Sequence, residues 1–243
     1  MSSHPVREVA TVTDAVLGPA LATDPASPLF TFYDDASDER TELSTLTAMN
    51  WAAKTANFLR DEIGVAPGDH VAVDLPEHWQ TFTILLGAWW AGAEVVLGAD
   101  PSASVAFCTR DRLDAHAGID EVVVAPLDPF ALPVGDLPIG VTDFGSGVRV
   151  HGDQFAPIVG GPAALDGRTV AEVVGAAADR ATADGITAGA RVLSTCRWDG
   201  VDGLIRGVLA APVAGASLVH VSHADAAVMA GRADTEKATV SLS

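Results

Sequence analysis

The alternation of apolar and polar positions predicts a strand, a helix and a second strand between residues 65 and 100. The first apolar run covers residues 71–75, and a segment of helical length follows at residues 79–91. Gly92 ends that segment, and a second apolar run covers residues 94–97. A strand–helix–strand unit of this length joins two parallel strands. Because the helix is apolar on nearly every face, we expect other layers of the protein to cover it on more than one side.

The same pattern predicts alternating strands and helices along the rest of the chain. Before the central unit, it predicts a helix at 11–21, a hairpin of residues 29–33 and 39–43, and a helix of about five turns that begins after Ser44 and ends at Gly64. After the unit, it predicts strands at 104–108, 121–125, 191–195, 217–221 and 238–242, one or two weaker strands within 140–150, and helices at 110–117, 169–183, 204–211 and 224–232.

This order of elements is typical of an α/β protein with mainly parallel sheets and helices on both faces. The length of 243 residues allows one sizeable core or two small ones. We expect residues 1–24 to form an N-terminal helix and a link. Residues 25–243 then form a single α/β domain, with possible lobes at 25–150 and 151–243.

The charge of the chain excludes some classes of partner. The formal net charge is −18, from 32 acidic and 14 basic residues, and only Lys54 and Lys237 are lysines. Nucleic acids and anionic membrane surfaces are bound through many lysines and arginines, so we expect neither as a partner. The same excess disfavours a polyphosphate ligand unless a local site overrides it.

Other bulk features predict a soluble, cytoplasmic protein. The N-terminus lacks the basic start and apolar run of a signal peptide, and no uncharged apolar run reaches 18 residues. Cys108 and Cys196 lie far apart in apolar or mixed sequence, so we expect buried free thiols and no disulfide.

Several runs of sequence resemble the N-terminal portion of the adenylate-forming enzymes, which include acyl-CoA synthetases, luciferases and peptide-synthetase adenylation domains. The similar features are the Leu43-Ser44 pair before a long helix, the Gly68-Asp69-His70-Val71 turn, the Ala91-Gly92-Ala93 helix end followed by Pro101, the later Gly215-Ala216 pair, and the final Ala238-Thr239-Val240 strand. The resemblance covers residues 25–243 in order. It is strongest to a short actinobacterial family whose members stop after this portion.

The resemblance implies a phosphate-binding loop between residues 156 and 169, but this chain departs from the family's pattern there. The family's loop is rich in serine, threonine and glycine and carries a lysine, whereas this segment reads APIVGGPAALDGRT. Arg168 is its only cation and Thr169 its only hydroxyl. Two interpretations stay open. Gly160, Gly161 and Gly167 are either turn glycines, or they form a rebuilt anion site with Arg168, Thr169 and the start of the following helix.

Two further interpretations concern single side chains. In the resembling family the loop that corresponds to Trp198 contributes to the acyl or aryl pocket, so Trp198 either lines a retained pocket or packs in the core. His220 and His223 are predicted to be solvated loop residues in preference to metal ligands.

The sequence therefore predicts a catalytically incomplete protein that binds a small ligand or another protein. We expect no catalytic residue, no metal and no cofactor, because the family's remaining motifs and catalytic lysine would lie beyond Ser243. A homodimer or a protein partner is expected to cover the face left by the missing half. The alternative is an ATP-dependent acyl or aryl ligase fragment that uses ATP or AMP with Mg²⁺ and completes its site with a second chain. A third possibility is a protein without any ligand.

Overall fold

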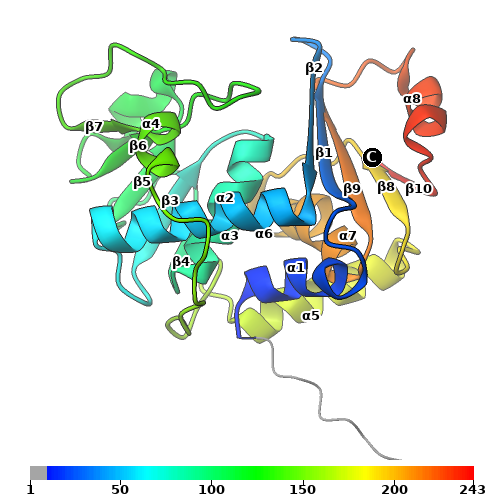
Figure 1. The fold of residues 1–243 in the computed structure, drawn as a ribbon, viewed down its shortest axis with the longest axis horizontal. Helices are drawn as coiled ribbons and strands as arrows, with labels where there is room; N and C mark the ends of the chain where they lie inside the picture. Colours follow the sequence, from blue (N-terminus) through cyan, green and yellow to red (C-terminus); the bar gives the residue numbers. More distant parts are fainter. Residues whose placement is uncertain (1–9) are drawn as a thin grey trace, which may run out of the picture.

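The computed structural model describes residues 10–243, which form two five-stranded sheets with helices between and around them (Figure 1). Sheet B has the strand order β4-β3-β5-β6-β7, and all its neighbouring strands are parallel. Its strands are β3 (His70–Asp74), β4 (Glu94–Leu97), β5 (Val105–Cys108), β6 (Val122–Val124) and β7 (Val141–Asp143). The central strand–helix–strand unit is confirmed, because β3 and β4 pair in parallel on either side of α3 (Trp79–Trp90).

Sheet A combines strands from both ends of the chain in the order β10-β8-β9-β1-β2. Its strands are β1 (Pro28–Asp34), β2 (Glu39–Ser44), β8 (Arg191–Ser194), β9 (Ser217–Ser222) and β10 (Val240–Leu242). β1 and β2 form the predicted antiparallel hairpin, and all other pairs are parallel. The α/β fold with mainly parallel sheets and flanking helices is therefore confirmed.

Helices fill the space between the sheets and cover their outer sides. They are α1 (Val12–Thr23), α2 (Thr45–Phe58) with a π-helical extension at Leu59–Ile63, the 3₁₀ segment Arg110–His116, α4 (Phe144–Arg149), α5 (Val170–Ala183), α6 (Gly200–Leu204), η3 (Ile205–Leu209), α7 (Ala210–Val213) and α8 (Met229–Glu236). Figure 1 shows α2 crossing between the two sheets. Ser44 caps α2, as predicted, by accepting a hydrogen bond from the Thr47 backbone at 3.1 Å.

Helix α3 is the centre of the core, and every one of its residues is buried. It packs closely on α2: a Cβ added to Gly87 would lie 2.5 Å from Cβ of Thr55. The two indoles at its end bind other segments, since Trp89 Nε1 donates to the Ala164 carbonyl at 2.8 Å and Trp90 Nε1 to Asp14 at 3.0 Å. The expected cover on several sides of this helix is confirmed.

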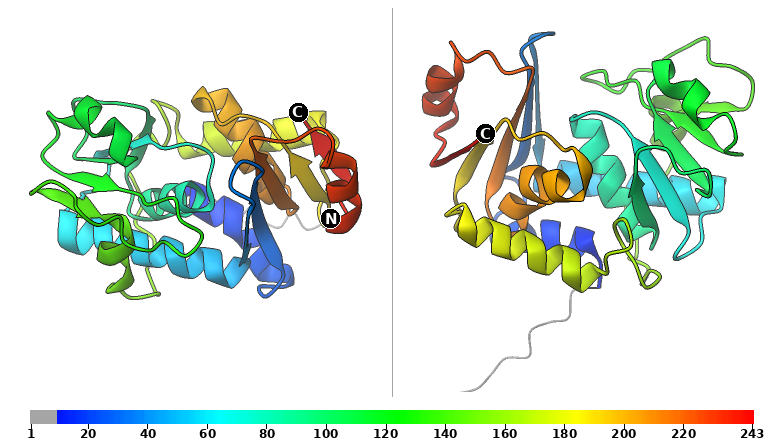
Figure 2. Two further views of the ribbon diagram at one scale, coloured as in Figure 1. Left: turned by 90° about the horizontal axis from the view of Figure 1, so that it is seen from above. Right: turned by 180° about the vertical axis from the view of Figure 1, so that it is seen from behind.

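Helix α8 lies on the outer side of sheet A, away from α2 and α3 (Figure 2). Glu236 joins it to the sheet by accepting hydrogen bonds from Tyr33 at 2.6 Å, from Arg40 at 3.1 Å, and from Arg191. Burial by itself raises the pKa of Glu236, but hydrogen bonds from Tyr33, Arg191 and Arg40 outweigh it and bring the pKa to about 2.

Three predicted regions differ from the structure in part. Residues 140–150 contain one strand, β7, as the prediction allows, but helix α4 follows it, because the Asp143 carboxylate accepts from the Ser146 backbone at 2.6 Å and starts a helix. The helix expected at 224–232 begins at Met229, since Asp225 holds a turn by accepting from the Ala227 backbone at 2.9 Å. The helix expected at 204–211 is part of a longer segment that begins at Gly200.

Two other expectations concern burial and membranes. Cys108 and Cys196 are buried and free, as predicted. Within residues 10–243, no helix is both long and apolar enough to cross a bilayer. The start of the N-terminal segment, on which the signal-peptide prediction rests, lies outside the described residues.

Candidate functional site

The first half of the expected phosphate loop packs against the central unit. The Gly68 backbone donates to the Gly92 carbonyl at 2.8 Å, and Gly160 and Gly161 lie directly on this contact. A Cβ on Gly160 would lie 2.7 Å from the Gly92 oxygen, and one on Gly161 would lie 2.8 Å from Cα of Gly68. Both contacts are with backbone atoms, which do not move aside easily. Glycine at these two positions therefore permits close packing of two backbones.

The second half of the segment is a tight turn at residues 165–168. Asp166 and Gly167 both have positive φ, at 43° and 80°, and the Arg168 backbone donates to the Leu165 carbonyl at 2.9 Å. The Asp166 backbone donates to the Val95 carbonyl at 3.0 Å. This hydrogen bond attaches the turn to the edge strand β4.

The N–H group of Gly167 binds a carboxylate of the protein itself, because it donates to Glu94 Oε1 at 2.7 Å. A phosphate-binding loop needs several N–H groups that converge on empty space. In this turn the N–H groups of Asp166, Gly167 and Arg168 all have partners within the protein. The turn offers no convergent donors to an anion in this arrangement.

Arg168 and Thr169 are engaged in separate contacts. Arg168 donates to Asp202 at 3.1 Å in a pair that is largely exposed to solvent. Thr169 caps α5 in a capping box with Glu172, whose carboxylate accepts from the Thr169 backbone at 2.8 Å. The positive end of α5 is therefore already next to a carboxylate.

Trp198 is a buried member of the main hydrophobic core. Its ring lies 6.2 Å from that of Phe30 and 5.0 Å from that of His220. Among the described residues its Nε1 has no hydrogen-bond partner, whereas its backbone N–H donates to Glu77 at 3.1 Å. Trp198 also lines a cavity, so the residue both packs in the core and borders an open space.

His220 lies within the sheet and is completely buried, so the prediction that it is a solvated loop residue is wrong. Burial, with a smaller effect from the charge of Arg197, lowers the pKa of His220 to about 3. The residue belongs to the predicted strand at 217–221, and its side chain is buried because β9 is an inner strand of sheet A, between β8 and β1. His223 is exposed and binds Asp34 at 2.8 Å.

A cleft between the two sheets contains a cavity of about 380 Å³ at the carboxyl ends of β3 and β4. Its charged lining consists of Asp74, Glu77, Asp166, Asp199, Arg112 and Arg197. Both arginines already bind carboxylates of that lining, Arg112 to Asp74 and Arg197 to Glu77 at 3.3 Å and Asp199 at 3.2 Å. Burial raises the pKa of Asp166. With carboxylates in excess, the cleft disfavours a phosphate.

The six predicted site residues divide into three groups. Trp198 lines the cleft cavity. Gly167, Arg168 and Thr169 follow Asp166, which lines the same cavity, in the turn and at the start of α5. Gly160 and Gly161 lie apart from this cavity, against the turns of the central unit. The structure brings the turn and the Trp198 loop to one cleft, but it does not gather all six candidates into one pocket.

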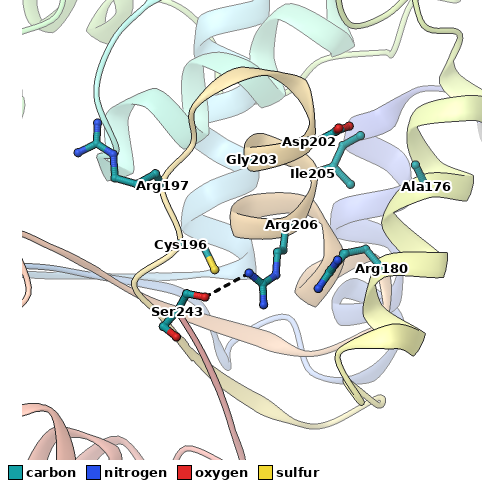
Figure 3. Close-up of a pocket in the computed structure, with 9 residues that line it drawn as sticks. All are labelled: Ala176, Arg180, Cys196, Arg197, Asp202, Gly203, Ile205, Arg206 and Ser243. Atoms are coloured by element: carbon teal, nitrogen blue, oxygen red, sulfur yellow. Dashed lines mark hydrogen bonds between the residues drawn. The ribbon is translucent and has the colours of Figure 1, made fainter.

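A second cavity, of about 470 Å³, lies on the other side of the loop that follows β8 (Figure 3). We call it the arginine-lined cavity. It is lined by Ala176, Arg180, Cys196, Arg197, Asp202, Gly203, Ile205, Arg206 and Ser243. No sequence motif marks it, because its arginines come from α5, a loop and η3. The spacing of Arg180 and Arg206 along the chain gives no sign that they converge.

Comparison with known proteins identifies a relative of similar length. A protein of Mycobacterium tuberculosis described as a TIGR03089 family protein is 49% identical over 236 residues, which cover 94% of this chain and 97% of the relative. No protein-family model matches the chain.

Solved structures share the fold at low sequence identity. An acyl-CoA synthetase of Brucella canis matches 95% of this chain with a TM-score of 0.76 and 17% identity, and the match covers 46% of that enzyme. The N-terminal domain of FACL13 from Mycobacterium tuberculosis matches 95% of this chain with a TM-score of 0.67 and 17% identity, over 62% of that chain.

A third structure, the anthranilate CoA ligase AuaEII in complex with anthranoyl-AMP, matches 95% of this chain with a TM-score of 0.69 and 15% identity, over 48% of that chain. This chain thus spans between about half and two thirds of the length of these solved proteins. The expected likeness to the N-terminal part of acyl-CoA synthetases is confirmed for the fold.

Proposed function

The chain belongs to the TIGR03089 family, and from that premise we propose that it is a binding module on an acyl-CoA synthetase fold, without adenylating activity of its own. The observation that carries this proposal is the contact between Gly167 N–H and the Glu94 carboxylate at 2.7 Å. It puts a negative charge into the segment that the family resemblance predicts to be a phosphate-binding loop.

The surroundings of this contact support the same proposal. Adenylation develops negative charge on the reacting phosphate, and stabilising that charge requires preorganised donors and cations. Arg168 is the only cation of the segment and is paired with Asp202, while Asp166 adds a carboxylate to the cleft. We therefore propose that the protein does not use ATP, AMP or Mg²⁺ as a cofactor.

The ligand proposed for the module is a small acyl, aryl or adenylate-like molecule, or another protein. Exposed apolar side chains support a protein partner or a homodimer, since Phe130, Leu132 and Ile139 all face solvent in one connecting segment. Light scattering after size exclusion tests self-association, and a clean monomer at high micromolar concentration contradicts the homodimer. We propose the cytoplasm as the location, from the composition alone.

The test of the central proposal is isothermal calorimetry with ATP-Mg²⁺, together with ATP–pyrophosphate exchange over a panel of aliphatic and aromatic acids. We expect no binding heat and no exchange above the protein-free background. Arg168→Ala is expected to change neither result. Exchange that depends on Arg168 contradicts the proposal.

The alternative function is a ligase fragment that completes its site with a second chain. The observation in its favour is that the salt bridge of Arg168 is weak, because its partner Asp202 is almost fully exposed to solvent. The guanidinium can therefore leave Asp202 and turn toward a ligand. This alternative predicts ATP binding that is lost in Arg168→Ala.

A further inference from the structure

The arginine-lined cavity has the size of a small-molecule site and walls of two kinds. Ala176 of α5, Ile205 of η3 and the buried Cys196 supply apolar surface, and Arg180 and Arg206 supply charge. Figure 3 shows these two guanidinium groups turned toward each other, with Arg197 pointing away. A volume of about 470 Å³ lies within the range of ligand pockets, roughly 300–1,000 Å³.

The two arginines share a single buried carboxylate. Arg180 donates to Asp184 at 2.8 Å and 2.5 Å, and Arg206 donates to the same group at 3.1 Å. Hydrogen bonds from Arg180, and then from Arg206, lower the pKa of Asp184. Two cations against one carboxylate leave one formal positive charge in this triad. This local excess occurs in a chain whose formal net charge is −18.

The remaining donors define where a ligand would bind. Arg206 also donates from Nη1 to an oxygen of Ser243 at 3.2 Å, which shows that an oxygen fits beside it. Nη1 of Arg180 has no hydrogen-bond partner within residues 10–243, and the side chain is about two-fifths exposed. A planar guanidinium with a free edge is well suited to a carboxylate.

We propose that this cavity binds a small molecule with a single carboxylate, held by Arg180 beside Arg206, with its apolar body against Ile205 and Cys196. This inference rests on the proposed binding function and names the class of ligand. A polyphosphate is disfavoured, because the carboxylate of Asp202 also lines the cavity and the excess charge of the triad is only one. The turn at 165–168 adjoins this cavity through the pair of Arg168 with Asp202.

Cys196 provides a direct probe of the cavity. Its alkylation by negatively charged iodoacetate and neutral iodoacetamide is measured by mass spectrometry on the full chain, with fully buried Cys108 as the internal control. The ratio of the two rates, relative to that of a cysteine peptide in solution, reports the local charge. We expect Arg180→Gln to lower this ratio about threefold, the scale of one partly exposed charge interaction.

The matched control is Arg197→Gln, which removes an arginine of the same lining that points away from the triad. It should change the ratio less than Arg180→Gln does. Benzoate should slow the reaction of Cys196 with iodoacetamide, and the neutral isostere benzamide should not. Equal protection by both compounds, or equal ratios in wild type and Arg180→Gln, overturns the proposal.

A second measurement decides the case in which Cys196 does not react. Benzoate is titrated into the protein with detection by calorimetry, first with wild type and then with Arg180→Gln. Binding by wild type that is weakened in the variant supports the site, and absence of binding by wild type overturns it. ATP binding at Arg168 would refute the proposed function. The comparison of wild type with Arg180→Gln would still be interpretable, because Arg180 binds Asp184, whereas Arg168 binds Asp202.

Discussion

Two regions adjoin α5, and they differ in what their hydrogen-bond donors contact. The turn at 165–168 leads into the start of the helix, and its N–H groups all bind oxygens of the protein. The arginine-lined cavity lies farther along the helix, where Arg180 keeps part of its guanidinium free of such contacts. Backbone donors depend on the path of the chain, and in the turn they are occupied by backbone carbonyls and by the Glu94 carboxylate. Side-chain donors can create a site without any change of fold.

The largest expected change in the free energy of unfolding tests whether Trp198 mainly packs in the core or mainly lines a pocket. Trp198→Ala should destabilise the protein by about 3–5 kcal/mol, because it empties a buried space next to Phe30 and His220. Urea unfolding measures the loss. Trp198→Phe is the control and should retain most of the stability. A loss below about 1 kcal/mol for the alanine variant would show a mainly pocket-lining residue.

The next effect tests whether the loop glycines serve packing. Gly161→Ala places a methyl group 2.8 Å from Cα of Gly68 and should cost about 1–3 kcal/mol. Gly175→Ala, within α5 and with no atom within 4 Å, is the matched control and should stabilise by about 0.5–1 kcal/mol. Thermal unfolding compares the two variants. Equal melting temperatures would mean that the loop does not hold its close contact in solution.

A third prediction concerns pH and His220. The pKa of this group is lowered to about 3 in the folded protein, so only the unfolded chain takes up its proton between pH 6.5 and 3. Acidification within that window therefore favours unfolding, and the loss between pH 7 and 5 should be about 1–2 kcal/mol. Urea unfolding at both pH values in wild type and His220→Phe checks this. An unchanged pH dependence in the variant would assign the effect to other groups.

The smallest effect tests the carboxylate in the turn. Glu94→Gln removes the charge that accepts from Gly167 N–H but leaves an oxygen in place, and it should cost about 0.5–1.5 kcal/mol. Urea unfolding again provides the measurement. If the variant gains phosphate binding that wild type lacks, the Glu94 charge alone prevents the turn from binding an anion. The difference between the turn and the arginine-lined cavity would then depend on a single side chain. If it binds none, the path of the chain keeps the turn closed.

The sequence predicts the architecture better than the site. Hydrophobic periodicity and the Ser44 cap locate the central unit and α2, because each depends on neighbouring residues. The missing lysine and the presence of Asp166 set the segment at 156–169 apart from the resembling family's loop in the sequence itself. The hydrogen-bond acceptor of the Gly167 N–H group could not be predicted, since Glu94 lies 73 positions away along the chain.

Two failures have the same physical origin. The burial of His220 depends on β9 having layers on both sides, and the strand alone does not reveal them. The convergence of Arg180 and Arg206 depends on the packing of α5 against η3, which brings both to Asp184. Packing between distant segments determines the surroundings of His220 and of the two arginines, whereas the local sequence pattern determines only the helices and strands.

The strand order of sheet A has a consequence for synthesis on the ribosome. Sheet B is formed by consecutive strands between residues 70 and 143, and these can pair as soon as they emerge. The β1–β2 hairpin emerges earlier, but the other edge of β1 pairs with β9, which is made only after all strands of sheet B. Until then that edge is an open template for other strands. The nascent chain therefore depends on rapid synthesis of β9 or on a chaperone to keep the hairpin from pairing with other chains.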